Sequence, residues 1–153
     1  MERKNQIKNV LNFCKVSEKA NLPYRATEGS AGMDLCACTE NEVTLNPGER
    51  AFIPCGIAMS LPSKEYVALV FARSGLSIKH GITLSNGVGV IDSDYRGEIG
   101  VGLCNLSENS YTIKPGDRIA QLLIMKVESL PIKEVTSLDD TVRGSKGFGS
   151  TGK

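Results

Sequence analysis

Apolar residues gather in short runs along the chain, and glycine, proline, asparagine or serine separates most runs from the next. Short runs rich in β-branched and aromatic residues, bounded by such turn formers, are typical of β-strands. Pro54 lies inside one run and predicts an edge strand or a bulge, because proline donates no ladder hydrogen bond. We expect strands over residues 10–14, 33–38, 43–45, 51–60, 66–71, 82–84, 88–91, 97–103, 111–113 and 118–127.

Helical periodicity is scarce. Residues 74–81 break the strand pattern and predict one helical turn, and a second short turn is expected near Leu138. The many short strands predict an all-β sandwich or barrel. After Val127 the pattern thins, and the glycine-rich composition of residues 143–153 is typical of a flexible tail. We therefore expect one domain, residues 1–142, followed by that C-terminal tail.

Two stretches, residues 46–50 (NPGER) and 114–118 (KPGDR), resemble each other, and both predict a turn that leads into a strand. In the strand after the second turn, simple alternation would put Arg118 and Gln121 on opposite faces. Gln121 would then share its face with the apolar Ile119. This pattern indicates a partly buried amide that is held by a protein partner or by a ligand.

Composition limits the classes of partner. The chain of 153 residues carries 18 basic and 17 acidic residues, a net charge of +1, which gives no support for binding nucleic acid or an anionic membrane. No run reaches the roughly 18 apolar residues of a membrane span, and the N-terminus lacks the apolar core of a signal peptide. The five cysteines are odd in number and lie mostly in apolar runs, so we expect buried thiols in a reducing, cytoplasmic compartment. The single histidine, His80, excludes a histidine-rich zinc site and is expected to be a structural or surface residue.

Candidate chemistry is concentrated in residues 87–97 (GVGVIDSDYRG). The β-branched residues before the acidic group favour a strand, and the flanking glycines permit tight turns and close backbone approaches. We therefore expect a β-hairpin with Asp92, Asp94 and Tyr95 at its tip. These residues alone leave two interpretations open, a site for a small ligand or an acidic surface turn.

Residues 73–75 (RSG) carry groups that suit phosphate oxygens. Arg73 offers a forked donor, Ser74 offers a hydroxyl, and Gly75 lets a ligand approach the backbone. The alternative is a surface arginine followed by a helix-capping serine. No P-loop sequence occurs, which excludes a P-loop NTPase.

The tail combines arginine, lysine, serine and threonine with one aromatic residue, Phe148. Such residues can hold a phosphate chain while the ring stacks on a base, so the tail is either a lid over a nucleotide or a flexible linker. Together with Arg73 and the carboxylates, they suit phosphoryl chemistry without a nucleophilic side chain. The phosphates of a nucleotide can supply most ligands of Mg²⁺, which would explain why the sequence has no metal-binding cluster.

Five segments, in order, resemble the five motifs of the homotrimeric dUTP pyrophosphatase (dUTPase) family. They are residues 31–35 (AGMDL), 73–76 (RSGL), 89–97 (GVIDSDYRG), 116–122 (GDRIAQL) and 143–152 (RGSKGFGSTG). The resemblance implies a jelly-roll-like β-sandwich or barrel of the dUTPase β-clip type, and a homotrimer whose three active sites each draw on all three chains. It also implies a cytoplasmic enzyme that uses Mg²⁺ to hydrolyse dUTP to dUMP and pyrophosphate, which keeps uracil out of DNA and supplies dUMP for thymidylate synthesis.

The same resemblance implies roles for individual residues. Asp92 is expected to be the general base that activates a water for attack on the α-phosphorus, and Tyr95 to pack under the deoxyribose and exclude a 2′-hydroxyl. Asp34 would reach Mg²⁺ through a water, without a direct protein ligand to the metal, and Arg118 would be a structural ion-pair partner. The other substrate contacts would be Asn86, Gly89 and Val90 at the uracil edge, Arg73, Ser74, Gly75 and Gln121 at the phosphates, and Arg143, Phe148, Gly149, Ser150 and Thr151 in the tail, with Phe148 over the uracil.

Two other functions compete with hydrolysis. One is a dCTP deaminase of the same structural superfamily, which also has an Arg-Ser segment, and the other is a nucleotide-binding trimer that regulates a partner. Residues 92–95 and the Phe148 tail fit hydrolysis better than deamination. The presence of every expected catalytic residue speaks against a purely regulatory protein.

Overall fold

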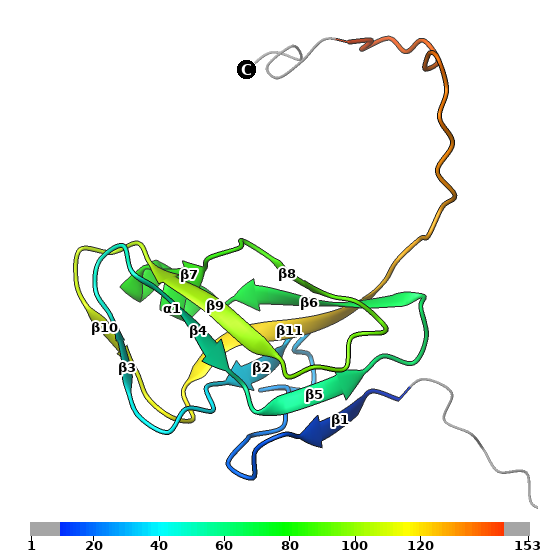
Figure 1. Ribbon diagram of the computed structural model, residues 1–153. Coiled ribbons are helices and arrows are strands. Elements are labelled where there is room, and N and C mark those ends of the chain that lie inside the picture. The colour runs from blue at the N-terminus through cyan, green and yellow to red at the C-terminus, as the bar shows by residue number, and fades with distance from the viewer. Residues whose placement is uncertain (1–9, 146–153) are drawn as a thin grey trace, which may run out of the picture.

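A computed structural model describes residues 10–145, and within them the chain forms eleven strands and one short helix. All strand pairs are antiparallel. Figure 1 shows how they gather into one body. A four-stranded sheet has the order β2 (Met33–Cys36), β11 (Arg118–Lys126), β6 (Tyr66–Ala72), β8 (Gly89–Ile91), and a three-stranded sheet has the order β4 (Arg50–Pro54), β9 (Gly100–Asn105), β7 (Ile82–Leu84). Two pairs complete the body, β1 (Asn12–Lys15) with β5 (Ile57–Ser60) and β3 (Val43–Leu45) with β10 (Tyr111–Ile113).

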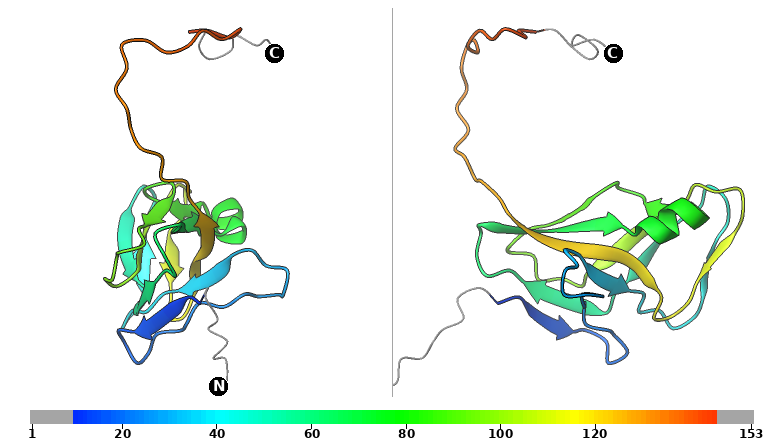
Figure 2. Two further views of the ribbon diagram at one scale, coloured as in Figure 1. Left: turned by 90° about the vertical axis from the view of Figure 1, so that its right-hand side faces the viewer. Right: turned by 180° about the vertical axis from the view of Figure 1, so that it is seen from behind.

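The inward faces of these sheets form one apolar core, and Figure 2 shows the strands around it from two further sides. Its largest fully buried side chains are almost all aliphatic, and they come from the strands and from the links between them. Burial of this surface is the main force that holds the sheets together. The predicted all-β, jelly-roll-like fold is confirmed. The core includes Leu35, Leu45, Ile53, Ile57, Ile82, Ile99, Leu103, Ile113, Ile119 and Leu122.

The apolar run over residues 51–60 is two strands, where the sequence predicts one. β4 ends at Pro54 and β5 begins at Ile57, and Gly56 between them has a φ of +67°. A Cβ at Gly56 would lie 2.5 Å from the Cys38 sulfur, so the chain turns where only glycine fits. The edge position predicted from Pro54 is confirmed, since β4 is the outer strand of its sheet.

The predicted helical turn is confirmed as α1 (Ser74–His80), which ends at Gly81 with a φ of +68°. It is the one helix in the described residues, and it is far too short to cross a membrane. The helical turn predicted near Leu138 is wrong, because residues 127–145 contain no helix and run away from the sheets (Figure 1). Leu138 is 84% exposed, so no packed surface stabilises a short helix there. The division at residue 142 stays a prediction.

Both predicted turns are present, and each follows one strand of the antiparallel pair β3–β10, so they lie at opposite ends of that pair. Gly48 and Gly116 have φ values of +77° and +85°. In each turn an acidic side chain accepts a hydrogen bond from the first backbone N–H: Glu49 from Asn46 at 2.9 Å, and Asp117 from Lys114 at 2.8 Å. The bonds from Asn46 lower the pKa of Glu49. The two turns are therefore structural equivalents.

The five cysteines are free thiols, as predicted, but they differ in environment. Cys36 and Cys55 are buried, whereas Cys14 is exposed. Burial raises the pKa of Cys55 to about 12 and also raises the pKa of Cys36, so both stay protonated at neutral pH. His80 is exposed, as expected, and its ring lies 4.9 Å from that of Tyr111.

Candidate active site

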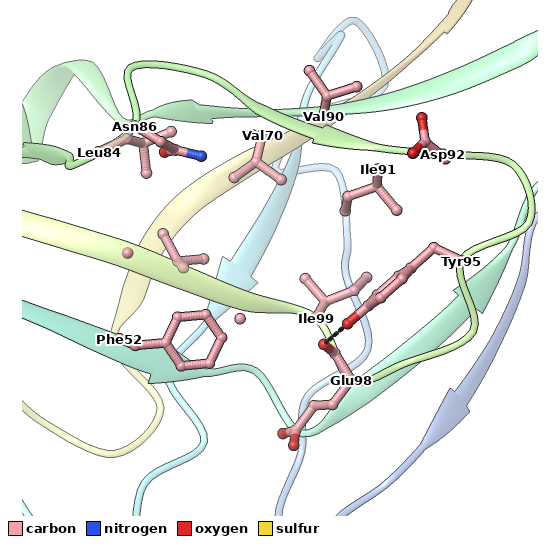
Figure 3. A pocket seen from close by; sticks show the side chains of 14 residues that line it. Phe52, Val70, Leu84, Asn86, Val90, Ile91, Asp92, Tyr95, Glu98 and Ile99 are labelled. Atoms are coloured by element: carbon pink, nitrogen blue, oxygen red, sulfur yellow. Dashed lines mark hydrogen bonds between the residues drawn. The ribbon is translucent and has the colours of Figure 1, made fainter.

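The strands on either side of residues 92–99 do not form the predicted hairpin. β8 pairs with β6 and β9 pairs with β4 and β7, so residues 92–99 link two different sheets. Ile99, directly before β9, is buried in the core, and the pairing of Val90 with Leu69 holds β8 on β6. The two strands therefore separate, and a cavity opens between them (Figure 3).

This first cavity, of about 230 Å³, brings together the residues predicted to bind the base and the sugar. Its lining includes Asn86, Gly89, Val90, Asp92 and Tyr95. A Cβ at Gly89 would lie 3.0 Å from the Val70 Cβ, so glycine lets β8 lie close against β6. Backbone groups of β8 and the Asn86 amide thus border a small cavity, an arrangement suited to reading the edge of a flat polar ring.

The end of this cavity is fixed by contacts within the link. The Tyr95 hydroxyl donates to the Glu98 carbonyl at 2.9 Å, and its ring lies over Gly97, where a Cβ would meet the hydroxyl at 2.5 Å. Arg96 donates from Nη1 to the carbonyls of Ser93 and Tyr95, both at 2.8 Å. Within the part of the chain that the structure describes, no hydrogen bond or ion pair engages the Asp92 carboxylate, which lies at the cavity (Figure 3). Asp92 is therefore available to accept a proton.

A second cavity, of about 750 Å³, lies where β2, β11 and the end of β6 meet. The register of the sheet pairs Gln121 with Asp34 on one side and with Phe71, two residues before Arg73, on the other. The cavity is lined by polar and small residues, among them Gly32, Asp34, Arg73, Ser74, Gly75, Arg118 and Gln121. Three segments far apart in sequence thus bring a set of hydrogen-bond donors together.

Asp34 holds two guanidinium groups at this cavity. Its Oδ1 lies 3.0 Å from Nε of Arg73 and its Oδ2 lies 3.1 Å from Nη1 of Arg118. Arg73 also donates from Nη1 to the Arg118 carbonyl at 3.0 Å. The Asp34 carboxylate, through its hydrogen bond and its charge, raises the pKa of Arg118. These contacts fix the orientation of the Arg73 guanidinium, whose remaining N–H groups are available to a ligand in the cavity.

The prediction that Arg118 and Gln121 lie on opposite faces of β11 is wrong. A β-bulge between Arg118 and Ala120 shifts the register, so Arg118 lines the same cavity as Gln121. The Gln121 amide is partly buried, as expected, and its Nε2 donates to the Ala72 carbonyl at 2.9 Å. A Cβ at Gly32 would lie 2.7 Å from the Gln121 Oε1, so Gly32 makes room for this amide.

The structure divides the predicted site residues into two groups. The first cavity is lined by Asn86, Gly89, Val90, Asp92 and Tyr95. The second is lined by the predicted phosphate-binding residues Arg73, Ser74, Gly75 and Gln121, so neither cavity contains both groups. Arg143 lines neither and lies in the segment that leaves the sheets (Figure 1). The tail residues Phe148, Gly149, Ser150 and Thr151 lie outside the described residues.

The sequence analysis did not predict two residues that help to form the cavities, Phe52 and Gly32. Phe52 lines the first cavity, and alternation along β4, with Ile53 buried, could have indicated that its ring points outward. Gly32 is needed beside Gln121, but only the pairing of β2 with β11 reveals that contact.

The residues at the second cavity fit a metal that arrives with phosphates better than a metal held by the protein. Among the described residues there is no group of three histidine, cysteine, aspartate or glutamate side chains that could hold an ion. Asp34 is the acidic side chain of this lining, and both of its oxygens contact arginines. Lone pairs remain on these oxygens for a bridging water. Arginine, serine and amide donors suit phosphate oxygens, which are themselves good ligands for Mg²⁺.

Comparisons with known proteins agree with this geometry. The sequence model of the dUTPase family matches residues 18–152. The deoxyuridine 5′-triphosphate nucleotidohydrolase of Finegoldia magna is 54% identical over 140 residues, which are 90% of this chain and 97% of that protein. The corresponding protein of Rickettsia felis is 50% identical over 147 residues, 96% of this chain and 95% of that one.

Solved structures give the same result. A mutant of the dUTPase of Staphylococcus bacteriophage 80alpha, solved with dUpNHpp, has a TM-score of 0.84 at 30% identity and covers 94% of this chain and 99% of its own. A mutant dUTPase from phage phi11 of S. aureus, whose structure describes the coordination of a structural Mg(II) ion, has a TM-score of 0.77 at 27% identity, with coverage of 86% and 100%. The chain belongs to the dUTPase family.

Proposed function

We propose that this protein hydrolyses dUTP to dUMP and pyrophosphate. The observation that carries the proposal is the joint presence of a small cavity with an available carboxylate and a second cavity with a fixed guanidinium. Hydrolysis of a nucleoside triphosphate needs both a base for the attacking water and donors that stabilise charge on the phosphates. Hydrolysis keeps uracil out of DNA and supplies dUMP for thymidylate synthesis.

In the reaction, Asp92 takes a proton from a water as the water oxygen bonds to the α-phosphorus. The bond from this phosphorus to the oxygen that bridges it to the β-phosphorus breaks, and pyrophosphate leaves. Arg73, Ser74 and Gln121 bind phosphate oxygens, and the backbone N–H of Gly75 in the first turn of α1 adds a donor. The role of these groups is to hold the triphosphate in line for attack.

The first cavity selects the base and the sugar. The Asn86 amide and the backbone of Gly89 and Val90 hydrogen-bond the uracil edge, so a cytosine amino group would meet mismatched partners. Tyr95, held by Glu98, packs under the deoxyribose, where its ring leaves no room for a 2′-hydroxyl. The cavity thus favours deoxyuridine over cytidine and over ribonucleosides.

Mg²⁺ would be held at this site mainly by the phosphates of the nucleotide, and Asp34, which also holds Arg73, would contact it through a water. The metal would supply positive charge that offsets the negative charge of the phosphate oxygens.

A homotrimer with shared sites is part of the proposal, because the two groups of residues line different cavities of one chain. In a trimer, the base cavity of one copy can face the phosphate cavity of another, with the tail of a third closing over both. Arg143, Ser150 and Thr151 would hold the γ-phosphate, Gly149 would approach it through its backbone, and Phe148 would stack over the uracil. The protein would act in the cytoplasm.

The test is pyrophosphate release from dUTP, dCTP, dTTP and UTP in the presence of Mg²⁺. We expect release from dUTP alone at an appreciable rate. Ammonia from dCTP without pyrophosphate from dUTP would identify a deaminase instead, and nucleotide binding with no product would indicate a regulatory protein.

Truncation after Arg143 is a test of the tail. We expect the protein to keep its fold and assembly, because the strands end at Lys126. The rate constant kcat/KM for dUTP should fall about 5- to 150-fold, since stacking on one base contributes about 1–3 kcal/mol. Circular dichroism and size-exclusion chromatography check the fold, and steady-state kinetics check the activity. Full activity in the truncated protein would mean that the tail has no role in catalysis.

A further inference from the structure

An aromatic ring outside the five motifs forms one wall of the base cavity. Phe52 lies on the edge strand β4 and is 71% exposed. It pairs with Gly102 on β9, and a Cβ added at the neighbouring Gly100 would overlap three carbons of its ring. The ring therefore lies over Gly100 and fills the space that its missing side chain leaves.

The position of the ring determines how wide the cavity is. Figure 3 shows Phe52 on the β9 side, across the cavity from Asn86 and β8. The cavity volume, about 230 Å³, is below the roughly 300–1,000 Å³ of common ligand sites. Because Gly100 has no side chain, the Phe52 ring occupies the space over it and limits the cavity there.

We propose that Phe52 determines specificity for the base by closing this wall against pyrimidines with a substituent at C5. The inference rests on the proposed function. Uracil has only a hydrogen at C5, so its flat apolar edge can lie against the ring and cover it from water. A methyl group at C5 needs volume that the ring occupies. The wall therefore rejects thymine by bulk, in addition to the hydrogen-bond match made by β8.

Phe52→Ala tests this role. We expect the ratio of kcat/KM for dTTP to that for dUTP to rise about tenfold or more, since one methyl group in a tight pocket accounts for about 10- to 200-fold. A series of dUTP analogues with larger C5 substituents should show the same trend. Leu106→Ala is the matched control, because Leu106 is similarly exposed but lines neither the base cavity nor the second cavity, and it should leave the ratio unchanged.

A second pair of variants tests the contact itself. Gly100→Ala should lower kcat/KM for dUTP in the natural background, because its methyl group displaces the ring, but should cost much less when combined with Phe52→Ala. Such coupling would show that the two positions compete for one volume. Equal losses in both backgrounds would contradict it.

Three outcomes separate the possible failures. If Phe52→Ala hydrolyses dUTP with an unchanged ratio, the specificity role is wrong. If the variant dissociates on size-exclusion chromatography with the ratio unchanged, the ring contacts another copy of the chain and the inference is also wrong. If the natural protein releases no pyrophosphate from dUTP, the proposed function fails, and calorimetry of deoxyuridine against thymidine binding, with and without Phe52→Ala, then decides whether the ring selects the base.

Discussion

Asp92→Asn should reduce the turnover of dUTP by about a thousandfold while leaving nucleotide binding nearly intact. The substitution keeps the shape of the side chain but removes its ability to take a proton, and general-base catalysis contributes about 10²- to 10⁴-fold. Asp92 is exposed at the base cavity, and within the described residues no partner competes for its oxygens. Single-turnover kinetics with dUTP, and calorimetry with the non-hydrolysable dUpNHpp, measure the two quantities separately.

Asp94→Asn is the control for this variant. Asp94 lies in the same link, and its substitution by asparagine removes the same charge. Because Asp94 does not line the cavity, turnover should change little. Unchanged turnover in Asp92→Asn, or equal losses in both variants, would show that the carboxylate of Asp92 is not the base. A loss of dUpNHpp binding in Asp92→Asn alone would instead make it a binding residue.

Local patterns were sufficient to predict most strands, because turn formers limit each strand within the sequence itself. β3, β7 and β10 have the predicted bounds, and the edge position of β4 is one of the two arrangements that Pro54 predicted. Proline and glycine act through their own backbone geometry, so their effect can be read without knowing what lies nearby.

Strand pairing is different, because a strand's own residues set which face is buried but not which strand lies beside it. Residues 87–97 have the composition of a hairpin, yet β8 joins β6 and β9 joins β4. The bulge after Arg118 also could not be predicted from the residues of β11 alone, since it depends on the register with β2. For this reason a family pattern could name residues that line the two cavities, whereas the place of Phe52 in the lining could not be predicted from the sequence.

The contact between Asp34 and Arg73 is the clearest example of such a long-range arrangement, and it supports the second large prediction. The side chains of Asp34 and Arg73 are only 11% and 25% exposed. Asp34→Ala would leave two guanidinium groups side by side without their shared counter-charge. Removing one partner of a buried ion pair costs about 3–5 kcal/mol, and because Arg73 keeps some contact with water we expect a loss near 3 kcal/mol in the free energy of unfolding.

Glu40→Ala is the matched control for stability. Glu40 pairs with Lys19 at 2.6 Å, but both side chains are mostly exposed, so we expect little change in the urea midpoint. If Asp34→Ala and Glu40→Ala shift the midpoint equally, the Asp34 pair is not a significant part of the fold.

Asp34→Ala should also lower kcat for dUTP about a hundredfold under conditions where the protein remains folded. A misplacement of about 1 Å in a group that positions substrate has an effect of this size. Asp34→Asn separates the two roles proposed for the carboxylate. An amide can still accept one hydrogen bond from Arg73, but it attracts a hydrated Mg²⁺ poorly. If Asp34 mainly positions Arg73, Asp34→Asn should recover part of kcat with no change in the Mg²⁺ concentration for half-maximal rate. If Asp34 also acts on the metal through water, that concentration should rise in Asp34→Asn. Full activity in Asp34→Ala would show that the carboxylate has neither role.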